Sequence, residues 1–276
     1  MDVECLTCKH YVPVEMLDIH ETTCIKKVEL TDVQQKALLY VMKKSSIFSK
    51  AVKYNLLEKI NKNDMKLLHS YVKNRVNTVI HINLDKILTK ILDDTEYRNQ
   101  FETGISGGSL SKTMRDDWEK QLFYGIYLNS AGPEKVKYGA INITNDPYGV
   151  RSAHGYGDSY FVLKPETKFR TSFVFGDSST KDLHIANYKN FNSVLLYIAP
   201  ILNEVVEVAS GVKPYSTVSY TYIEAQIHGP ILFNRDVASL VVNPKYKQYS
   251  ENHHMLPVIE EFCTKNGIDL VFADEL

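Results

Sequence analysis

Cysteine and tryptophan are scarce in this chain of 276 residues, which contains four cysteines and one tryptophan. No apolar stretch approaches the about 20 residues that a membrane-spanning helix needs. The N-terminal sequence MDVECLTC has neither a basic region nor an apolar run, so we expect no secretory signal peptide. We also expect the cysteines to be reduced. Together these features predict a cytoplasmic protein, with the nucleus as the alternative compartment.

Charge of neither sign is in large excess, because the formal net charge is −1. Such a chain has no global field that attracts nucleic acid or a membrane. Residues 31–98 alone carry 13 Lys and Arg against 7 Asp and Glu. We interpret this local surplus as the solvated faces of lysine-rich helices rather than as a polyanion site. We therefore expect no membrane or nucleic-acid partner, and we also expect a monomer.

What the sequence does contain divides it into three parts, 1–28, 29–100 and 101–276. The overall composition, 44% hydrophobic and 24% charged, is that of an ordinary soluble globular protein. Three of the four cysteines lie in the first part, in the pattern Cys5-x2-Cys8-x11-His20-x3-Cys24. Two thiolates in a knuckle, followed by His and Cys one helical turn apart, offer the tetrahedral ligand set of structural zinc. Residues 1–28 are too few to bury a core, so we expect Zn²⁺ to fold them.

The second part has apolar residues at helical spacing. Thr31 to Gln34 reads as a capping box that opens a helix, and the period then continues to about residue 98. We predict three or four helices, with breaks near Ser45-Ser46 and near 61–63. This part is therefore expected to be a helical region, whose role would be to present an acceptor.

From about residue 101 the sequence changes to short alternating runs with frequent glycine, aromatic and β-branched residues. One helix is expected at about 191–209, bent at Pro200, and another from Pro257 to Gly267. Strands outnumber helices and no βαβ unit repeats, which favours an α+β fold. The candidate strands are 121–128, 137–143, 159–164, 169–175, 219–227, 239–242 and 268–272.

The run from Tyr220 to Pro230 is the most informative of these strands. Alternation directs Ile223, Ala225 and Ile227 to one face. The opposite face carries polar and aromatic side chains, including a carboxylate and an imidazole, and resembles a cleft wall more than an ordinary solvent-facing strand; its members are Tyr220, Tyr222, Glu224, Gln226 and His228. Periodicity alone gives the cleft wall and the solvent-facing strand about equal weight.

Two further polar clusters follow candidate strands. The turn Gly176-Asp177-Ser178-Ser179 comes directly after the strand 169–175, and residues 145–147 follow the strand 137–143. Both are ordinary turn chemistry when taken alone. The glycine-rich 104–108 could let backbone amides approach a phosphate, but it lacks the lysine of a P-loop. His253-His254 lies in a polar stretch where we expect no second metal site.

Four strings of the third part appear in an order that resembles a known family: Phe101-Glu102-Thr103-Gly104, Lys137-Tyr138-Gly139-Ala140-Ile141-Asn142, Phe175-Gly176-Asp177-Ser178 and Glu224-Ala225-Gln226-Ile227-His228-Gly229-Pro230. They resemble the CteC-like ADP-ribosyltransferases, a PARP-like family, over residues 101–245. The resemblance implies a split β-sheet core, preceded here by the helical region and the zinc finger. It also implies transfer of ADP-ribose from NAD⁺ to a protein side chain, such as a threonine of ubiquitin.

The same resemblance implies roles for individual residues. This family uses an Asp–Glu pair, for which Glu224 matches the glutamate and Asp177 is the preferred aspartate, with Asp146 and Asp158 as rivals. Thr103-Gly104 stands at the first-strand place where PARPs have His-Gly. Tyr138, Tyr220 or Tyr222 could stack on nicotinamide or adenine, and core packing is the alternative for each, which we expect to hold for at least one of them. The residues expected to contact NAD⁺ are Thr103, Gly104, Tyr138, Asn142, Ser178, Gln226 and His228.

The N-terminal finger is similar to the ubiquitin-binding fingers of DNA-repair proteins. Those fingers commonly carry an aspartate two residues after the histidine, where this chain has Thr22. A ubiquitin-binding finger and a purely structural or nucleic-acid-binding finger therefore have about equal weight. For the whole protein we retain two alternatives: a non-enzymatic zinc-finger adaptor whose transferase-like domain binds a nucleotide, and an NAD⁺ glycohydrolase that also uses Glu224.

Overall fold

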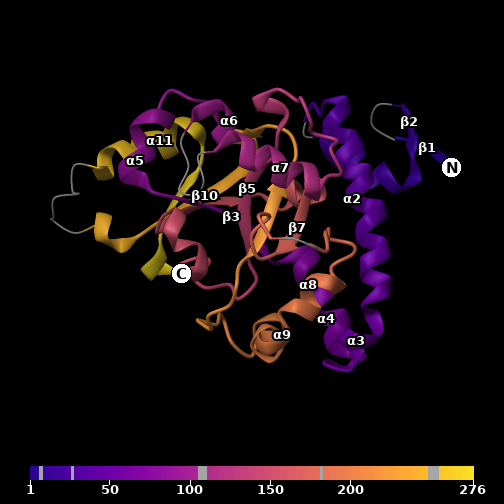
Figure 1. Cartoon of the computed structure of the whole chain (residues 1–276). Coiled ribbons are helices and arrows are strands. Elements are labelled where there is room, and N and C mark those ends of the chain that lie inside the picture. Colours follow the sequence, from indigo (N-terminus) through magenta and orange to yellow (C-terminus); the bar gives the residue numbers. More distant parts are fainter. Residues whose placement is uncertain (6–8, 26–27, 105–110, 181–182, 248–254) are drawn as a thin grey trace.

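The computed structural model describes residues 1–276 except 6–8, 26–27, 105–110, 181–182 and 248–254. Seven strands of the described residues form one mixed sheet in the order β11-β10-β6-β3-β5-β8-β7 (Figure 1). Neighbouring strands are antiparallel except for the parallel pair β10–β11. The strands are β3 (Asn77–Ile82), β5 (Lys137–Asn142), β6 (Ser159–Leu163), β7 (Thr171–Phe175), β8 (Ile223–Ile227), β10 (Val237–Val242) and β11 (Asp269–Phe272). This mixed α and β architecture agrees with the expected α+β class.

Helices cover one face of this sheet and build the main core. The apolar side chains of β8, Ile223, Ala225 and Ile227, lie in that core together with Phe161 of β6 and Phe173 of β7. Burying such a face against helices is the main source of stability in this class of fold. The helices that contribute to the core are α3 (Lys53–Leu57), α4 (Lys62–Asn74), α5 (Leu84–Ile91), α8 (Asn192–Tyr197), α9 (Leu202–Ser210) and α11 (Met255–Asn266).

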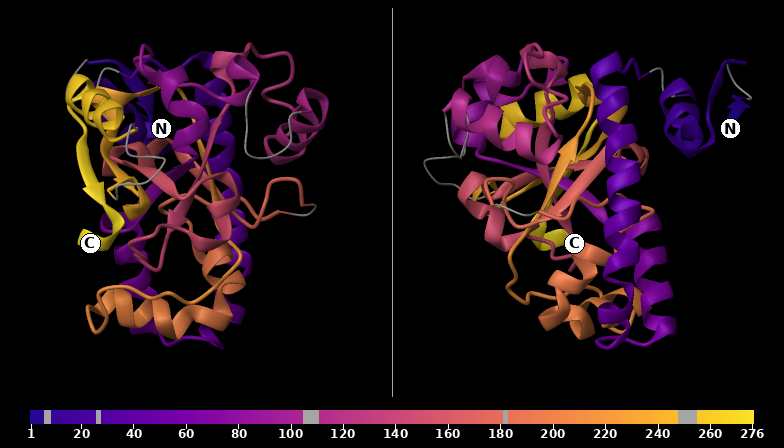
Figure 2. Two further views of the ribbon diagram at one scale, coloured as in Figure 1. Left: turned by 90° about the vertical axis from the view of Figure 1, so that its left-hand side faces the viewer. Right: turned by 45° about the vertical axis from the view of Figure 1, so that its right-hand side comes forward.

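The remaining elements are shorter or lie at the edges. The N-terminal residues form a hairpin of β1 (Asp2–Glu4) and β2 (Tyr11–Pro13), followed by α1 (Leu17–Ile25). Figure 2 shows this segment at the periphery, next to one end of the long helix α2 (Asp32–Ala51). Two short strands, β4 (Glu96–Tyr97) and β9 (Ile231–Leu232), pair with each other, and three short helices are α6 (Gln100–Thr103), α7 (Lys112–Leu122) and α10 (Phe233–Asp236).

The helix start predicted from the capping box and the predicted break near 61–63 are confirmed, whereas the break predicted near Ser45-Ser46 is wrong. Thr31 and Gln34 form the expected capping box of α2, and Asn61 caps α4. No break occurs at Ser45, because its hydroxyl donates to the Met42 carbonyl within the continuous helix. Pro200 lies in the 3₁₀ turn that separates α8 from α9, which confirms the predicted bend.

Two strand predictions are wrong in an informative way. Residues 121–128 are not a strand; they contain the end of α7 and a turn in which Tyr124 and Gly125 have positive φ. Conversely, β3 lies in a region predicted to be wholly helical. Its residues 78–82 are buried on both faces, so their pattern lacks the polar alternation of a half-exposed strand. The other six predicted strands are confirmed, with bounds that shift by up to four residues.

No helix in the described part of the chain is long and apolar enough to cross a membrane.

Candidate active site

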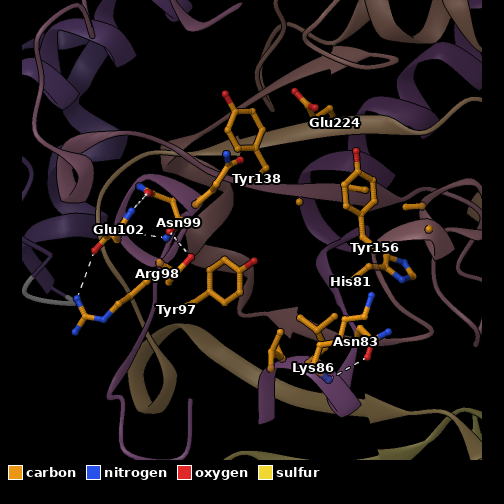
Figure 3. Close-up of a pocket in the computed structure, with 18 of the residues that line it drawn as sticks. His81, Asn83, Lys86, Tyr97, Arg98, Asn99, Glu102, Tyr138, Tyr156 and Glu224 are labelled. Atoms are coloured by element: carbon orange, nitrogen blue, oxygen red, sulfur yellow. Dashed lines mark hydrogen bonds and ion pairs between the residues drawn. The ribbon is translucent and has the colours of Figure 1, made fainter. Parts of the chain in front are cut away.

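A cavity of about 870 Å³ opens on the face of the sheet that the main core does not occupy. Glu224 lines it because alternation along β8 places this side chain opposite Ile223 and Ala225. In Figure 3, Glu224 lies near Tyr138 and Tyr156, whereas Asn83 and Lys86 lie at the opposite end. The residues that line the cavity come from several elements, among them β3, α5, α6, α7, β5, the 3₁₀ segment Arg151–Tyr156, the turn after β7, and β8.

The carboxyl group of Glu224 is almost completely buried, with 6% of the residue exposed. Burial raises its pKa to about 7, and the negative charge of Asp177 acts in the same direction. Hydrogen bonds from Gln226 and Ser178 oppose this shift. The Gln226 amide donates to Glu224 Oε1 at 2.8 Å. Glu224 is therefore a carboxyl group that changes its charge near neutral pH.

Asp177 lines the same cavity from the turn that follows β7. Gly176 permits this turn, since its φ of 79° is unfavourable for other residues. The Tyr222 hydroxyl donates to Asp177 Oδ2 at 2.8 Å, and the Ser179 amide donates to Oδ1 at 2.7 Å. Burial alone would raise the pKa of Asp177, but the hydrogen bonds from Ser179 and Tyr222, with the charge of Arg115, bring it below its usual value.

The two carboxyl groups consequently have pKa values that are shifted in opposite directions within one cavity. Below about pH 7 the two groups therefore differ in charge, because Asp177 is ionised whereas Glu224 ionises only as the pH rises through about 7. The rival aspartates lie elsewhere. Asp146 pairs with Arg151 at 2.6 Å and Asp158 pairs with Lys245 at 2.7 Å, and neither is among the described residues that line the cavity.

Four of the seven residues expected to contact NAD⁺ line the cavity: Thr103, Gly104, Tyr138 and Ser178. Thr103 ends the short helix α6 and Gly104 is its left-handed C-cap, so the expectation that they stand on a first strand is wrong. The run 99–103 has a capping box, which favours a helical turn over a strand.

The other three expected contacts do not line the cavity. The Asn142 side chain accepts from the Asp146 amide and donates to its carbonyl, so it closes the turn after β5. Gln226 and His228 are fully buried behind Glu224. Tyr220 also lies outside the cavity, with its hydroxyl on the Ile141 carbonyl, whereas Tyr222 lines it.

Several cavity residues carry chemistry that the sequence reasoning missed. Arg115 and Trp118 lie three residues apart on α7, and the Arg115 guanidinium lies 5.3 Å from the centre of the Tyr138 ring. Lys86 and Lys90 lie four residues apart on α5. Residues three or four apart lie on the same face of a helix. Because every amphipathic helix has such pairs, this spacing alone does not indicate a functional site.

His81, from the missed strand β3, is a fifth such residue, and its ring nitrogens are both used by the backbone. Nδ1 lies 2.9 Å from the Gly157 carbonyl, and the Val150 amide donates to Nε2 at 2.9 Å. Because Nε2 accepts, Nδ1 carries the proton and the ring is neutral. Burial lowers the pKa of His81 to about 4, so the neutral form persists at physiological pH.

Comparison with protein families matches residues 78–213 and 211–275 to the family described as "Protein of unknown function (DUF3626)". The chain belongs to this DUF3626 family. The matched residues include all seven strands of the large sheet, Asp177 and Glu224. No curated protein matches the chain. The family description names no activity, so any function has to be argued from the site.

The predicted metal ligands lie outside the part that matches the DUF3626 family. Sγ of Cys5 and Cys24 and a ring nitrogen of His20 lie within 4.8 Å of one another. Cys5 follows β1, and His20 and Cys24 share one face of α1, as the spacing predicts. Two thiols and one imidazole fit the donors that Zn²⁺ prefers, so this cluster could bind a metal. Cys8, the expected fourth ligand, lies outside the described residues, as do Ile105–Gly108 and His253-His254.

Proposed function

We propose that this protein is a mono-ADP-ribosyltransferase that moves ADP-ribose from NAD⁺ to a protein side chain. The observation that carries this proposal is that Glu224 and Asp177, from separate elements, line one cavity together with several aromatic and basic side chains. The order of the motifs that resemble CteC-like transferases supports it. A carboxylate on a strand with an antiparallel neighbour on either side, as Glu224 has on β8, is also compatible with the PARP-like sheet that this resemblance implies.

The cavity is suited to a dinucleotide. Its volume of about 870 Å³ is near the upper end of the about 300–1,000 Å³ typical of small-molecule pockets. Tyr138, Tyr156 and Trp118 offer aromatic faces for nicotinamide or adenine, and Lys86 and Arg115 offer positive charge for the pyrophosphate.

In the proposed reaction, the bond between ribose C1 and the nicotinamide nitrogen breaks, and the electron pair leaves with nicotinamide. The ribose then resembles an oxocarbenium ion, as in glycoside cleavage. Ionised Glu224, held near the ribose 2-hydroxyl, stabilises this developing positive charge. The acceptor hydroxyl oxygen forms the new bond to C1, and its proton passes to Asp177. Since the electrophile is cationic, the hydroxyl loses its proton only as that bond forms.

The N-terminal segment is the proposed acceptor-binding part, with ubiquitin as the first acceptor to test. A structural Zn²⁺ held by Cys5, Cys8, His20 and Cys24 would fold it. Asp18 of α1 accepts from the Tyr188 hydroxyl at 2.9 Å and pairs with Lys189 at 2.6 Å, so the segment contacts the matched part of the chain.

One assay tests the proposal against its alternatives. The full chain is incubated with NAD⁺ and ubiquitin, and intact ubiquitin is weighed while free nicotinamide is measured. A gain of one ADP-ribose by the wild type, absent with Glu224→Gln, supports the transferase. Nicotinamide release with no modified acceptor indicates the glycohydrolase. Binding of NAD⁺ without any consumption indicates the adaptor.

A further inference from the structure

Next to Glu224 lies a chain of buried polar side chains that do not line the cavity and that the proposed reaction does not use. Its members are Gln226, Ser172, His228 and Tyr127, of which none is more than 1% exposed. Each contacts the next: Gln226 Nε2 to Glu224 Oε1 at 2.8 Å, Ser172 Oγ to Gln226 Oε1 at 2.9 Å, Ser172 Oγ to His228 Nε2 at 3.2 Å, and Tyr127 Oη to His228 Nδ1 at 2.7 Å.

The direction of every bond follows from its donors and acceptors once Glu224 is ionised. An ionised carboxylate only accepts, so Gln226 must present its NH₂ to Glu224 and its carbonyl to Ser172. That carbonyl only accepts, so the Ser172 hydroxyl proton points to it. Ser172 Oγ must then accept from His228 Nε2–H. His228 Nδ1 is left as an acceptor, which the Tyr127 hydroxyl satisfies.

We propose that Tyr127, His228, Ser172 and Gln226 form a directed hydrogen-bond relay that fixes the position and charge of Glu224. Their role would be to position Glu224, since no member of the relay lines the cavity. The hydrogen bonds of the relay are independent of the proposed function. Only the effect of the relay on turnover rests on that function. A buried network in which every donor and acceptor is paired is rigid, whereas an unpaired buried polar group raises the free energy of the folded state. Loss of one donor is therefore expected to affect every hydrogen bond of the relay.

Charged groups lie near both ends of the relay. Near Tyr127 they are Glu119, Glu134 and Lys135, and Lys135 donates to the Tyr127 carbonyl rather than to its hydroxyl, at 3.3 Å. Arg170 donates to the His228 carbonyl, not to its ring, and its charge is paired with Asp236. Phe123 packs against the His228 ring from a second side. Around Glu224 the titratable neighbours are Asp177, Tyr138 and Tyr222. Burial keeps His228 neutral by lowering its pKa to about 3, as a directed relay requires.

The most informative variant is Tyr127→Phe, which removes one hydroxyl four hydrogen bonds away from Glu224. Without that donor, the His228 ring is free to reverse its tautomer, and Ser172 can turn its proton toward Nε2. Gln226 then loses the constraint that directs its NH₂ to Glu224. A hydrogen bond to a charged group contributes about 1.5–3 kcal/mol, so we expect the Glu224 pKa to rise by about 1 unit or more.

The test uses NMR of the isotopically labelled full chain, which requires no enzymatic activity. At pH 8 the His228 ring, identified by its response to Tyr127→Phe, should be neutral with the proton on Nε2. His81 is the internal reference, because its contacts require the opposite tautomer. The carboxyl carbon of Glu224, identified by its absence in Glu224→Gln, should titrate at higher pH in Tyr127→Phe than in the wild type.

Tyr71→Phe is the matched control, since Tyr71 is also buried and its hydroxyl donates to the Ile143 carbonyl, outside the relay. It should leave the Glu224 titration unchanged. An Nδ1–H tautomer of His228 in the wild type at pH 8 would overturn the relay, as would equal Glu224 titrations in Tyr127→Phe and Tyr71→Phe. A wild type that shows the predicted tautomer but consumes no NAD⁺ would retain the relay and contradict the proposed function.

Discussion

At the scale of single residues, the chemistry of the site depends on the hydrogen bonds that the carboxyl groups of Glu224 and Asp177 accept from neighbouring side chains. Tyr222, just before β8, and Gln226, within it, lie two residues to either side of Glu224. Tyr222 donates to Asp177 and Gln226 donates to Glu224. The bond from Tyr222 lowers the pKa of Asp177, whereas the bond from Gln226 opposes the rise that burial and the charge of Asp177 cause in the pKa of Glu224. We expect a substitution of Tyr222, Glu224 or Gln226 to change the charge in the cavity more than it changes the fold.

The raised pKa of Glu224 predicts a specific dependence of stability on pH. In the folded protein this carboxyl binds its proton up to about pH 7, whereas its reference value is 4.5. Between these values the folded state binds more protons than the unfolded state, so stability falls as pH rises. Glu224→Gln removes this loss. The unfolding free energy of Glu224→Gln minus that of the wild type, both measured in urea, should therefore increase by about 3 kcal/mol between pH 4.5 and pH 7.

Other groups, including Glu119, titrate in the same range, but they are common to both proteins and cancel in the difference. A difference in unfolding free energy that stays constant from pH 4.5 to 7 would contradict the raised pKa of Glu224.

At the scale of elements, the cavity depends on how α7 is attached to β5. Lys135, just before β5, is buried and donates to Asp116 at 2.6 Å and to Glu119 at 3.4 Å, both on α7. The Tyr138 hydroxyl of β5 also donates to Glu119, at 3.1 Å. These bonds hold α7 in the orientation in which Arg115 and Trp118 line the cavity.

Lys135→Met should therefore destabilise the protein substantially, since it leaves Glu119 buried without its cation. Breaking a buried ion pair in this way costs about 3–5 kcal/mol, which urea unfolding can measure. Adding Glu119→Gln should recover part of the loss, because a neutral amide at that position needs no counter-charge. A Lys135→Met protein within about 1 kcal/mol of the wild type would show that the pair does not hold α7.

The elements also show what the sequence could predict. Strands with one apolar face, such as β8, and helices with clear caps, such as α2 and α4, were predicted because period and cap chemistry are local signals. β3 was missed because both of its faces are buried and helices flank it. Within the site, Asp177 and Glu224 were placed through motifs. Arg115, Trp118 and His81 were missed because the fold brings them to the cavity from separate elements, and no local pattern records that.

At the scale of the whole molecule, the chain combines the sheet that matches the DUF3626 family with an N-terminal segment outside the match. The segment is short, and its described residues include the group Cys5, His20 and Cys24, which could hold a metal ion. We propose that a metal ion held by this cluster keeps the segment folded, whereas the large sheet has an extensive apolar core.

Metal removal should consequently unfold one part and spare the other. After treatment with a chelator, or in Cys5→Ser, amide hydrogens of residues 1–28 should exchange rapidly, while those of β5 and β8 stay protected. Hydrogen exchange read by mass spectrometry resolves the two regions. Loss of protection throughout the sheet would show that the N-terminal segment is part of one cooperative unit with the sheet.

The central claim is that Glu224 promotes the loss of nicotinamide from NAD⁺, and the rate of nicotinamide release measures this most directly. The rate should rise with pH to a plateau above about pH 7, as Glu224 ionises. In Glu224→Gln it should fall by about 10²–10³-fold, the usual effect of removing one electrostatic contact to a transition state. Tyr71→Phe should retain the wild-type rate and pH profile. A Glu224→Gln protein that releases nicotinamide as fast as the wild type would contradict the account.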